Sequence, residues 1–159
     1  MKLIILAVAV ALSALYFIKN ANSKKAALQN IERGNSFLTA NKANQYVVET
    51  ASGLQYKILK KGDGSVHPSA NSTVKVHYHG TLLDGTVFDS SVERNEPISF
   101  PLNRVIKGWT EGLQLMVTGD TFKFFIPAYL AYGNAATGKI KPGSVLIFDE
   151  VMTGFRAGP

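Results

Sequence analysis

At 159 residues the chain is long enough for one domain and an appendage, and its 46% hydrophobic content allows a core of ordinary size. The absence of cysteine excludes disulfides, thiolate zinc sites and cysteine nucleophiles. The net charge of +6 lies mostly in residues 1–45, which hold six basic residues and one acidic residue, whereas residues 46–159 hold 11 basic and 10 acidic residues. A nearly neutral domain lacks a basic surface for phosphate backbones, so we expect no nucleic acid as a partner.

The first predicted element is an apolar segment, residues 3–18, which contains no charged residue. Its composition is typical of a signal peptide, and its length is close to the roughly 20 residues that a membrane helix needs. We therefore interpret residues 1–23 as a signal peptide or a membrane anchor, and we expect N-terminal membrane contact. Lys19, Lys24 and Lys25 follow the segment and conflict with the positive-inside rule for a domain outside the cytoplasm, so the orientation stays open.

Residues 24–45 are polar and rich in alanine and asparagine. Leu28, Ile31 and Phe37 recur at loosely helical spacing, but Gly34 interrupts the pattern. We interpret this segment as a polar spacer or a short helix. A dimerising helix would need a longer apolar stripe.

The rest of the chain alternates between strand patterns and turns. Apolar and polar side chains alternate, as in half-buried strands, at residues 54–59, 74–79, 86–88, 98–100, 121–126 and 145–152. Asp84 and Gly85 predict a hairpin turn. An apolar stripe that begins at Val105 and includes Trp109 predicts one amphipathic helix that ends near Gly119. These patterns predict an α+β domain, in which five or six antiparallel strands have one face covered by a short helix, after an apolar N-terminal helical segment.

Several residues are candidates for a functional site. Phe88 and Asp89 are adjacent, so on a regular strand they would point to opposite faces, unless a bulge or the strand end turned Asp89 inward. The aromatic residues fit a core as well as a pocket, and the pattern alone leaves the two open. His77 and His79 share one strand face, where exposed imidazoles are favoured over a metal site because no carboxylate or thiolate stands at ligand spacing. A serine hydrolase is disfavoured because no Gly-x-Ser-x-Gly motif is present.

Six sequence runs occur in an order that points to one protein family: residues 50–56, 76–80, 84–91, 105–112, 130–133 and 146–149, including VHYHG, DGTVFDSS, VIKGWTEG and LAYG. With these runs the chain resembles the FKBP-type peptidyl-prolyl cis/trans isomerases, and within them the bacterial macrophage-infectivity-potentiator-like branch. The resemblance implies an isomerase domain at residues 46–157 and a twisted antiparallel sheet wrapped around one short helix. It implies no cofactor and no metal.

The resemblance also implies a site, residue by residue. The catalytic residues would be Phe88, Asp89, Trp109 and Tyr132, and the substrate-binding residues would be Tyr78, Arg94, Ile98, Val105, Ile106, Ile140 and Phe148. Ile98 stands where well-known eukaryotic relatives carry an aromatic residue. Glu150 stands where a buried apolar residue is expected, and because an unpaired buried charge is costly, we expect a bulge or an early strand end there.

The implied function is isomerisation of X-Pro bonds in unfolded or nascent polypeptides, by desolvation and twisting of the prolyl amide in an aromatic pocket. The macrolides tacrolimus and rapamycin are expected to bind. A non-catalytic holdase chaperone that uses the same apolar surface is the alternative. With the N-terminal segment, the resemblance places the protein in the bacterial cell envelope, either anchored in the inner membrane and facing the periplasm, or periplasmic after signal cleavage.

Overall fold

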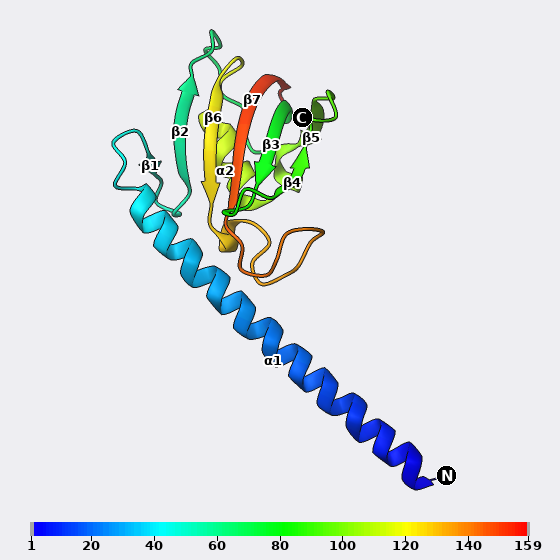
Figure 1. Cartoon of the computed structure of the whole chain (residues 1–159). Helices are drawn as coiled ribbons and strands as arrows, with labels where there is room; N and C mark the ends of the chain where they lie inside the picture. The colour runs from blue at the N-terminus through cyan, green and yellow to red at the C-terminus, as the bar shows by residue number, and fades with distance from the viewer. Residues whose placement is uncertain (1, 159) are drawn as a thin grey trace.

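A computed structural model describes the backbone of residues 2–158 and the side chains of residues 13–158. The chain begins with one long helix, α1 (Lys2–Asn41), whose 40 residues span about 60 Å. Figure 1 shows that its first half extends away from the domain, whereas its second half lies against it. The predicted interruption at Gly34 is wrong, because the helix continues through this residue.

No helix within the described residues is both long enough and apolar enough to cross a membrane. About half of the predicted signal peptide or anchor, residues 1–12 of 1–23, has side chains outside the described part of the chain. It therefore stays a prediction.

The domain is built on a seven-stranded antiparallel sheet in the order β1-β2-β6-β7-β3-β4, with β5 paired to β3 beside β4. The strands are β1 (Val48–Glu49), β2 (Gln55–Lys60), β3 (Thr73–Thr81), β4 (Val87–Ser90), β5 (Ile98–Pro101), β6 (Thr121–Ile126) and β7 (Leu146–Arg156). All six predicted strands are present. The short β1 is the additional strand, so the α+β class is confirmed with one strand more than expected.

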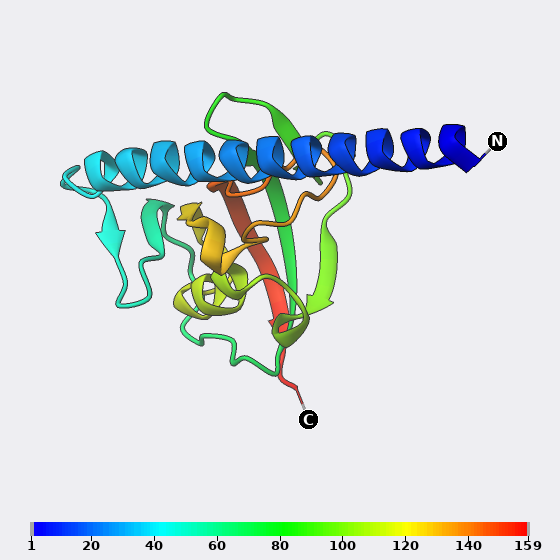
Figure 2. The same ribbon diagram turned by 90° about the horizontal axis from the view of Figure 1, so that it is seen from below.

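The predicted amphipathic helix is present but shorter than expected. It consists of α2 (Lys107–Gly112) with the 3-10 turns η1 (Leu102–Arg104) before it and η2 (Leu113–Leu115) after it. The chain becomes extended at Met116, and the Asp120 carboxylate accepts the N–H of Val117 in the turn that follows. The apolar face of α2 packs on the sheet and closes the main core. Figure 2 shows α2 and α1 on different sides of the domain.

The hairpin between β3 and β4 forms as predicted, and it contains a bulge. Gly85 has φ +85° in the turn. In the ladder Gly80 pairs with Asp89 and Thr81 pairs with Val87, so Phe88 is the extra residue. A bulge of this kind re-aims the side chains beside it. The bulge therefore allows the side chains of Phe88 and Asp89 to point to the same side of the sheet, which a shared site requires.

The expectation for Glu150 is wrong. Strand β7 runs through this residue in regular register with Tyr78 and Phe122, and its bulge falls later, where Lys75 pairs with Gly154 and Val76 with Met152. The side chain of Glu150 is fully buried on the core face, and neither carboxylate oxygen has a hydrogen-bond partner. Burial therefore raises the pKa of Glu150 well above its ordinary value, which favours the neutral acid.

A second, smaller cluster joins α1 to the other face of the sheet. Leu38 of α1 is buried with Phe125 and Val145, and the ring of Phe37 lies 5.8 Å from that of Phe125. Two hydrogen bonds tie this end of the helix to Gln55: Asn41 donates to its Oε1 at 2.9 Å, and Gln55 donates to the Leu38 carbonyl at 2.8 Å. The second half of α1 is thus packed on the domain rather than serving as a loose spacer.

Candidate functional site

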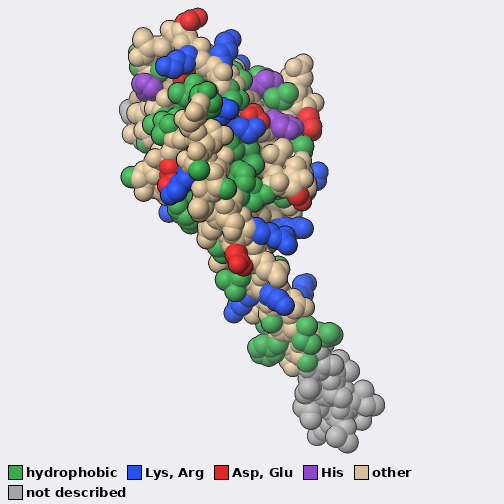
Figure 3. Space-filling model, turned by 60° about the vertical axis from the view of Figure 1, so that its left-hand side comes forward, with side chains coloured by type: hydrophobic (Ala, Val, Ile, Leu, Met, Phe, Trp, Pro, Cys, Tyr) green, Lys and Arg blue, Asp and Glu red, His purple; other side chains and the backbone are tan. Residues whose placement is uncertain are grey.

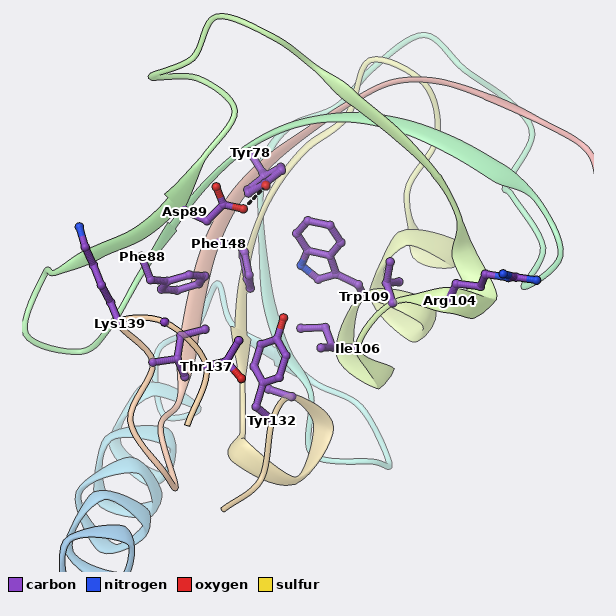
Figure 4. Close-up of a pocket in the computed structure, with 14 residues that line it drawn as sticks. Tyr78, Phe88, Asp89, Arg104, Ile106, Trp109, Tyr132, Thr137, Lys139 and Phe148 are labelled. Atoms are coloured by element: carbon purple, nitrogen blue, oxygen red, sulfur yellow. Dashed lines mark hydrogen bonds between the residues drawn. The ribbon is translucent and has the colours of Figure 1, made fainter. Parts of the chain in front are cut away.

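A cavity of about 720 Å³ opens between the sheet, α2 and the segment that follows β6. Its described lining consists of Tyr78, Phe88, Asp89, Arg104, Val105, Ile106, Trp109, Ala131, Tyr132, Thr137, Gly138, Lys139, Ile140 and Phe148. Nine of the eleven residues that the sequence singled out are in this set. Figure 4 shows that their side chains converge on one space, although they come from β3, β4, the region from η1 to α2, the segment after β6, and β7.

One side of the cavity is a set of rings that we call the aromatic wall: Tyr78, Phe88, Trp109 and Phe148. Phe148 on β7 is central, with its ring centroid 4.9 Å from Trp109 and 5.3 Å from Phe88 in edge-to-face arrangements. Tyr78 lies 5.1 Å from Trp109, again edge to face. Phe100 stacks on Trp109 at 5.2 Å, although it does not line the cavity. These geometries are the favourable ones for aromatic pairs, so the wall is rigid as well as apolar.

The one carboxylate in the described lining, Asp89, is ion-paired with Arg94 and hydrogen-bonded by Tyr78. Tyr78 donates its hydroxyl to Asp89 Oδ2, and Arg94 donates to Asp89 Oδ1 at 2.5 Å and to the Tyr78 hydroxyl at 3.2 Å. Burial opposes the charge of Asp89, but the hydrogen bonds from Tyr78 and Arg94 outweigh it and lower the pKa of Asp89. Burial and the bond to Asp89 raise the pKa of Tyr78 to about 12. Asp89 is therefore charged and Tyr78 is protonated at neutral pH.

The indole N–H of Trp109, a lining residue, is buried without a hydrogen-bond partner, and two further donors at the cavity also have none in the described part of the chain. The backbone N–H of Ile106, just before α2, donates to no protein group. The hydroxyl of Tyr132, a residue that is 40% exposed, is also free, and Figure 4 shows it pointing into the cavity. Both groups can donate hydrogen bonds to the carbonyl groups of a bound polypeptide.

The side of the cavity opposite the aromatic wall was only partly predicted. It is formed by Ala131, Tyr132 and a segment that we call the rim loop, residues 133–143, which supplies Thr137, Gly138, Lys139 and Ile140. Sequence reasoning named only Tyr132 and Ile140 here. It also missed Arg104 at the end of η1. Small and charged residues in a loop carry no periodic signal, so only the length of this segment between two strands could have pointed to it.

Two predicted substrate-binding residues do not line the cavity. Ile98 on β5 pairs with Val76, and its side chain packs against the core, so it supports the domain behind the site. Arg94 is exposed in the loop after β4 and approaches Asp89 and Tyr78 from outside the cavity. Its contact with the cavity is indirect.

The two strand histidines form hydrogen bonds to serines. His77 Nδ1 lies 2.7 Å from Ser91 Oγ, and His79 Nδ1 lies 2.9 Å from Ser90 Oγ. Both rings are partly buried, and both serines are buried. Within the described residues, no group of three or more metal-ligating side chains comes together.

Two protein-family models together match most of the chain. The family model of FKBP-type peptidyl-prolyl cis-trans isomerase matches residues 64–151. The model of the domain amino-terminal to FKBP-type peptidyl-prolyl isomerase matches residues 8–58, which include most of α1.

Individual proteins show the same similarity. The FKBP-type peptidyl-prolyl cis-trans isomerase FkpA of Aeromonas hydrophila is 52% identical over 132 residues, which are 83% of this chain and 49% of that protein. The outer membrane protein MIP of Legionella longbeachae is 47% identical over 82% of this chain and 56% of its own length. The chain thus spans about half the length of these curated relatives. The crystal structure of FkpA from Escherichia coli superposes with a TM-score of 0.87 at 36% identity, over 96% of this chain and 73% of that one.

Proposed function

Because the chain belongs to the family of FKBP-type peptidyl-prolyl cis-trans isomerases, we propose that it catalyses isomerisation of X-Pro bonds in unfolded or nascent polypeptides. The observation that carries this proposal is the cavity itself. It combines four rings that all contact one another through Phe148, a charge-paired carboxylate and unpartnered hydrogen-bond donors in a space of about 720 Å³. A proline ring and its flanking amides fit a site of this size and polarity.

The reaction needs stabilisation of a twisted amide and no covalent step. Rotation about a peptide bond has a barrier of ~18–20 kcal/mol. The planar amide has a larger dipole than the twisted one, so water stabilises the ground state more. Transfer of the bond into an apolar pocket removes that advantage and favours the transition state. A ten-thousandfold acceleration requires only about 5 kcal/mol, which desolvation and a few oriented hydrogen bonds can supply.

Each group in the cavity has a role in this scheme. The aromatic wall excludes water from the prolyl amide, and Val105 and Ile106 grip the proline ring beside Trp109. The Ile106 amide and the Tyr132 hydroxyl bind carbonyl groups of the substrate and fix its direction. Asp89, held charged by Arg94 and Tyr78, interacts with the carbonyl carbon as the amide twists.

The direct test is refolding of a protein whose slow phase is limited by a prolyl bond. We expect the full chain to accelerate this phase catalytically and rapamycin or tacrolimus to abolish the effect. Uncatalysed isomerisation takes tens of seconds or more, so the change is readily measured. An unchanged slow phase at micromolar protein would overturn the proposal.

A proline-free client distinguishes the holdase alternative. A holdase would suppress aggregation of that client, and the substitution Asp89→Ala would leave the suppression intact. The matching family model and the Aeromonas hydrophila relative are named as isomerases, so the comparisons do not favour a holdase as the sole function.

We propose a location in the bacterial cell envelope with N-terminal membrane contact, either by an inner-membrane anchor or before signal cleavage. One relative is named as an outer membrane protein. Four consecutive apolar residues of α1, residues 15–18, are each more than half exposed, and Figure 3 shows hydrophobic and basic side chains gathered on this part of the helix. Mass spectrometry of the mature N-terminus, together with alkaline extraction of the membrane fraction, separates the two forms. A full-length protein that extraction releases completely would contradict the anchor.

A further inference from the structure

The rim loop is closed at its base but exposed along most of its length. The N–H of Gly143 donates to the Gly133 carbonyl at 2.8 Å, which joins the two ends. Inside the loop Thr137 and Ile140 exchange a pair of backbone hydrogen bonds, at 3.0 and 2.8 Å. Residues 134–139 are exposed, and Lys139 makes one exposed bond to the Val87 carbonyl at 3.3 Å. The loop is therefore held at two places, at its base and at Ile140, whose side chain is buried in the main core.

That base rests on α1. Asn30 donates its side-chain N–H to the Pro142 carbonyl at 2.8 Å. The next residue, Gly143, is buried so closely against the helix that an added Cβ would lie 2.5 Å from the Ala27 carbonyl oxygen and 2.9 Å from the Ile31 side chain. One turn further along the helix, a Cβ on Gly34 would lie 2.7 Å from Val145 Cγ2. Figures 1 and 2 both show the loop lying alongside the helix at this point.

The same loop supplies four residues to the cavity, Thr137, Gly138, Lys139 and Ile140. They stand only a few residues from Pro142, whose carbonyl binds Asn30. A change in the position of the loop base relative to the helix is therefore transmitted over a short, hydrogen-bonded path to the cavity.

We propose that α1 is a positioning element of the active site, in which Ala27 and Asn30 hold the base of the rim loop and thereby set the substrate-binding side of the pocket. Neither residue touches the cavity. The proposal rests on the proposed isomerase function for its kinetic readout, but the position of the loop can be measured without it.

The chain contains a matched control for the hydrogen bond. Asn30 and Asn41 lie on the same helix, and each donates one side-chain N–H to the domain, at 2.8 and 2.9 Å. Asn30 reaches the rim loop, whereas Asn41 reaches Gln55 on β2, away from the cavity. In the full chain we expect Asn30→Ala to raise KM about three- to tenfold with kcat within twofold, as expected for loss of one hydrogen bond. Asn41→Ala should leave KM unchanged at a similar loss of thermal stability, and Asn30→Gln, which keeps the donor, should recover part of the affinity.

A glycine pair provides a second, independent test. Gly143 and Gly133 both have positive φ, +75° and +57°, so an alanine strains the backbone at either position. Only at Gly143 does the new methyl group meet the helix, because nothing lies within 4 Å of a Cβ at Gly133. Gly143→Ala should therefore weaken substrate binding more than Gly133→Ala does.

Hydrogen exchange of the rim-loop amides separates failure of this proposal from failure of the proposed function. Asn30→Ala should speed exchange at Ile140 and Gly143, and Asn41→Ala should not. Faster exchange in a protein without isomerase activity would support the positioning role and overturn the function. Equal exchange and equal KM in the two asparagine variants would overturn the positioning role.

Discussion

The two sides of the pocket are built in different ways. The aromatic wall is part of the folding core: Tyr78, Trp109 and Phe148 are each less than a tenth exposed, and each contacts the other rings. The opposite side, with the rim loop, is largely exposed and is supported from outside the domain by α1.

This difference means that residues of the aromatic wall support both the fold and the site, whereas residues of the rim loop mainly support the site. Removal of a ring from the aromatic wall opens the core as well as the site, so stability and activity constrain the same residues. Apart from Ile140, which is buried in the core, a rim-loop residue can change without loss of the core, because loops carry few of the contacts that hold the fold. We therefore expect substitutions in the wall to have large effects and substitutions in the loop to have small ones.

The largest effect is expected for Trp109→Ala. The indole contacts three other rings and faces the site, so its loss removes a central part of the aromatic wall. We expect kcat/KM in a prolyl-peptide assay to fall about a hundredfold or more, equivalent to ~2.7 kcal/mol of transition-state stabilisation. Unfolding should also become easier by about 3–5 kcal/mol. Phe88→Ala, at a half-buried position, should lower activity with a smaller loss of stability, and normal activity in both variants would contradict the pocket assignment.

Asp89→Asn is expected to lower kcat/KM about tenfold, because it removes the charge but keeps the shape. Asp149→Asn is the matched control, since Asp149 is a similarly exposed carboxylate paired with Lys123 at 3.1 Å outside the pocket.

The lowered pKa of Asp89 means that its contribution to stability is present above its unfolded-state pKa near 3.8 and is lost as pH falls through the lower folded value. Activity that depends on this carboxylate should therefore persist to acid pH, as a pH profile of kcat/KM would show.

The same contrast explains how much the sequence could predict. Alternation and aromatic content located the sheet, the six motif runs contained eight of the predicted lining residues, and the family resemblance added Ile140 from the loop between two runs. Periodicity is a local signal, and it reports burial well where strands and helices are regular. It could not find Thr137 or Lys139, which have no pattern. It also misjudged Gly34, because the helix survives there by close packing on Val145, a contact between residues far apart in the chain.

Glu150 shows that the free-energy cost of a buried acid does not by itself predict where a strand is interrupted. Because buried charge is unfavourable, we expected the backbone to give way at this position, but the β7 ladder holds and the side chain is buried without a partner. Regular hydrogen bonds to both neighbouring strands outweigh the penalty for one acid, which is reduced further when that acid is neutral.

Replacement of Glu150 by methionine tests whether the core beside the aromatic wall tolerates this acid at a cost. Folding raises the pKa of Glu150, so its contribution to stability is fully present below the unfolded-state pKa near 4.5 and is lost as pH rises through the folded value. Urea denaturation should show Glu150→Met to be more stable than the parent by about 1–3 kcal/mol at pH 7.5 and by less at pH 4. Glu93→Met, at an exposed position, should show no such pH-dependent gain. A gain that is equal at the two pH values would mean that Glu150 is not the titrating group.

The smallest effect is expected for Lys139→Ala on the rim loop. Its ammonium group makes one exposed hydrogen bond to the Val87 carbonyl, at 3.3 Å, so it bridges the loop to the start of β4 next to Phe88. An exposed bond of this kind contributes little, and we expect KM to rise less than about threefold with unchanged kcat and thermal stability. Steady-state kinetics beside Phe88→Ala make the comparison direct, because Lys139 binds the carbonyl of the residue before Phe88 and the two side chains are neighbours at the same end of the cavity (Figure 4). If Lys139→Ala were as damaging as Phe88→Ala, the loop would carry catalysis as the wall does, and the division between a rigid wall and an adaptable rim would be wrong.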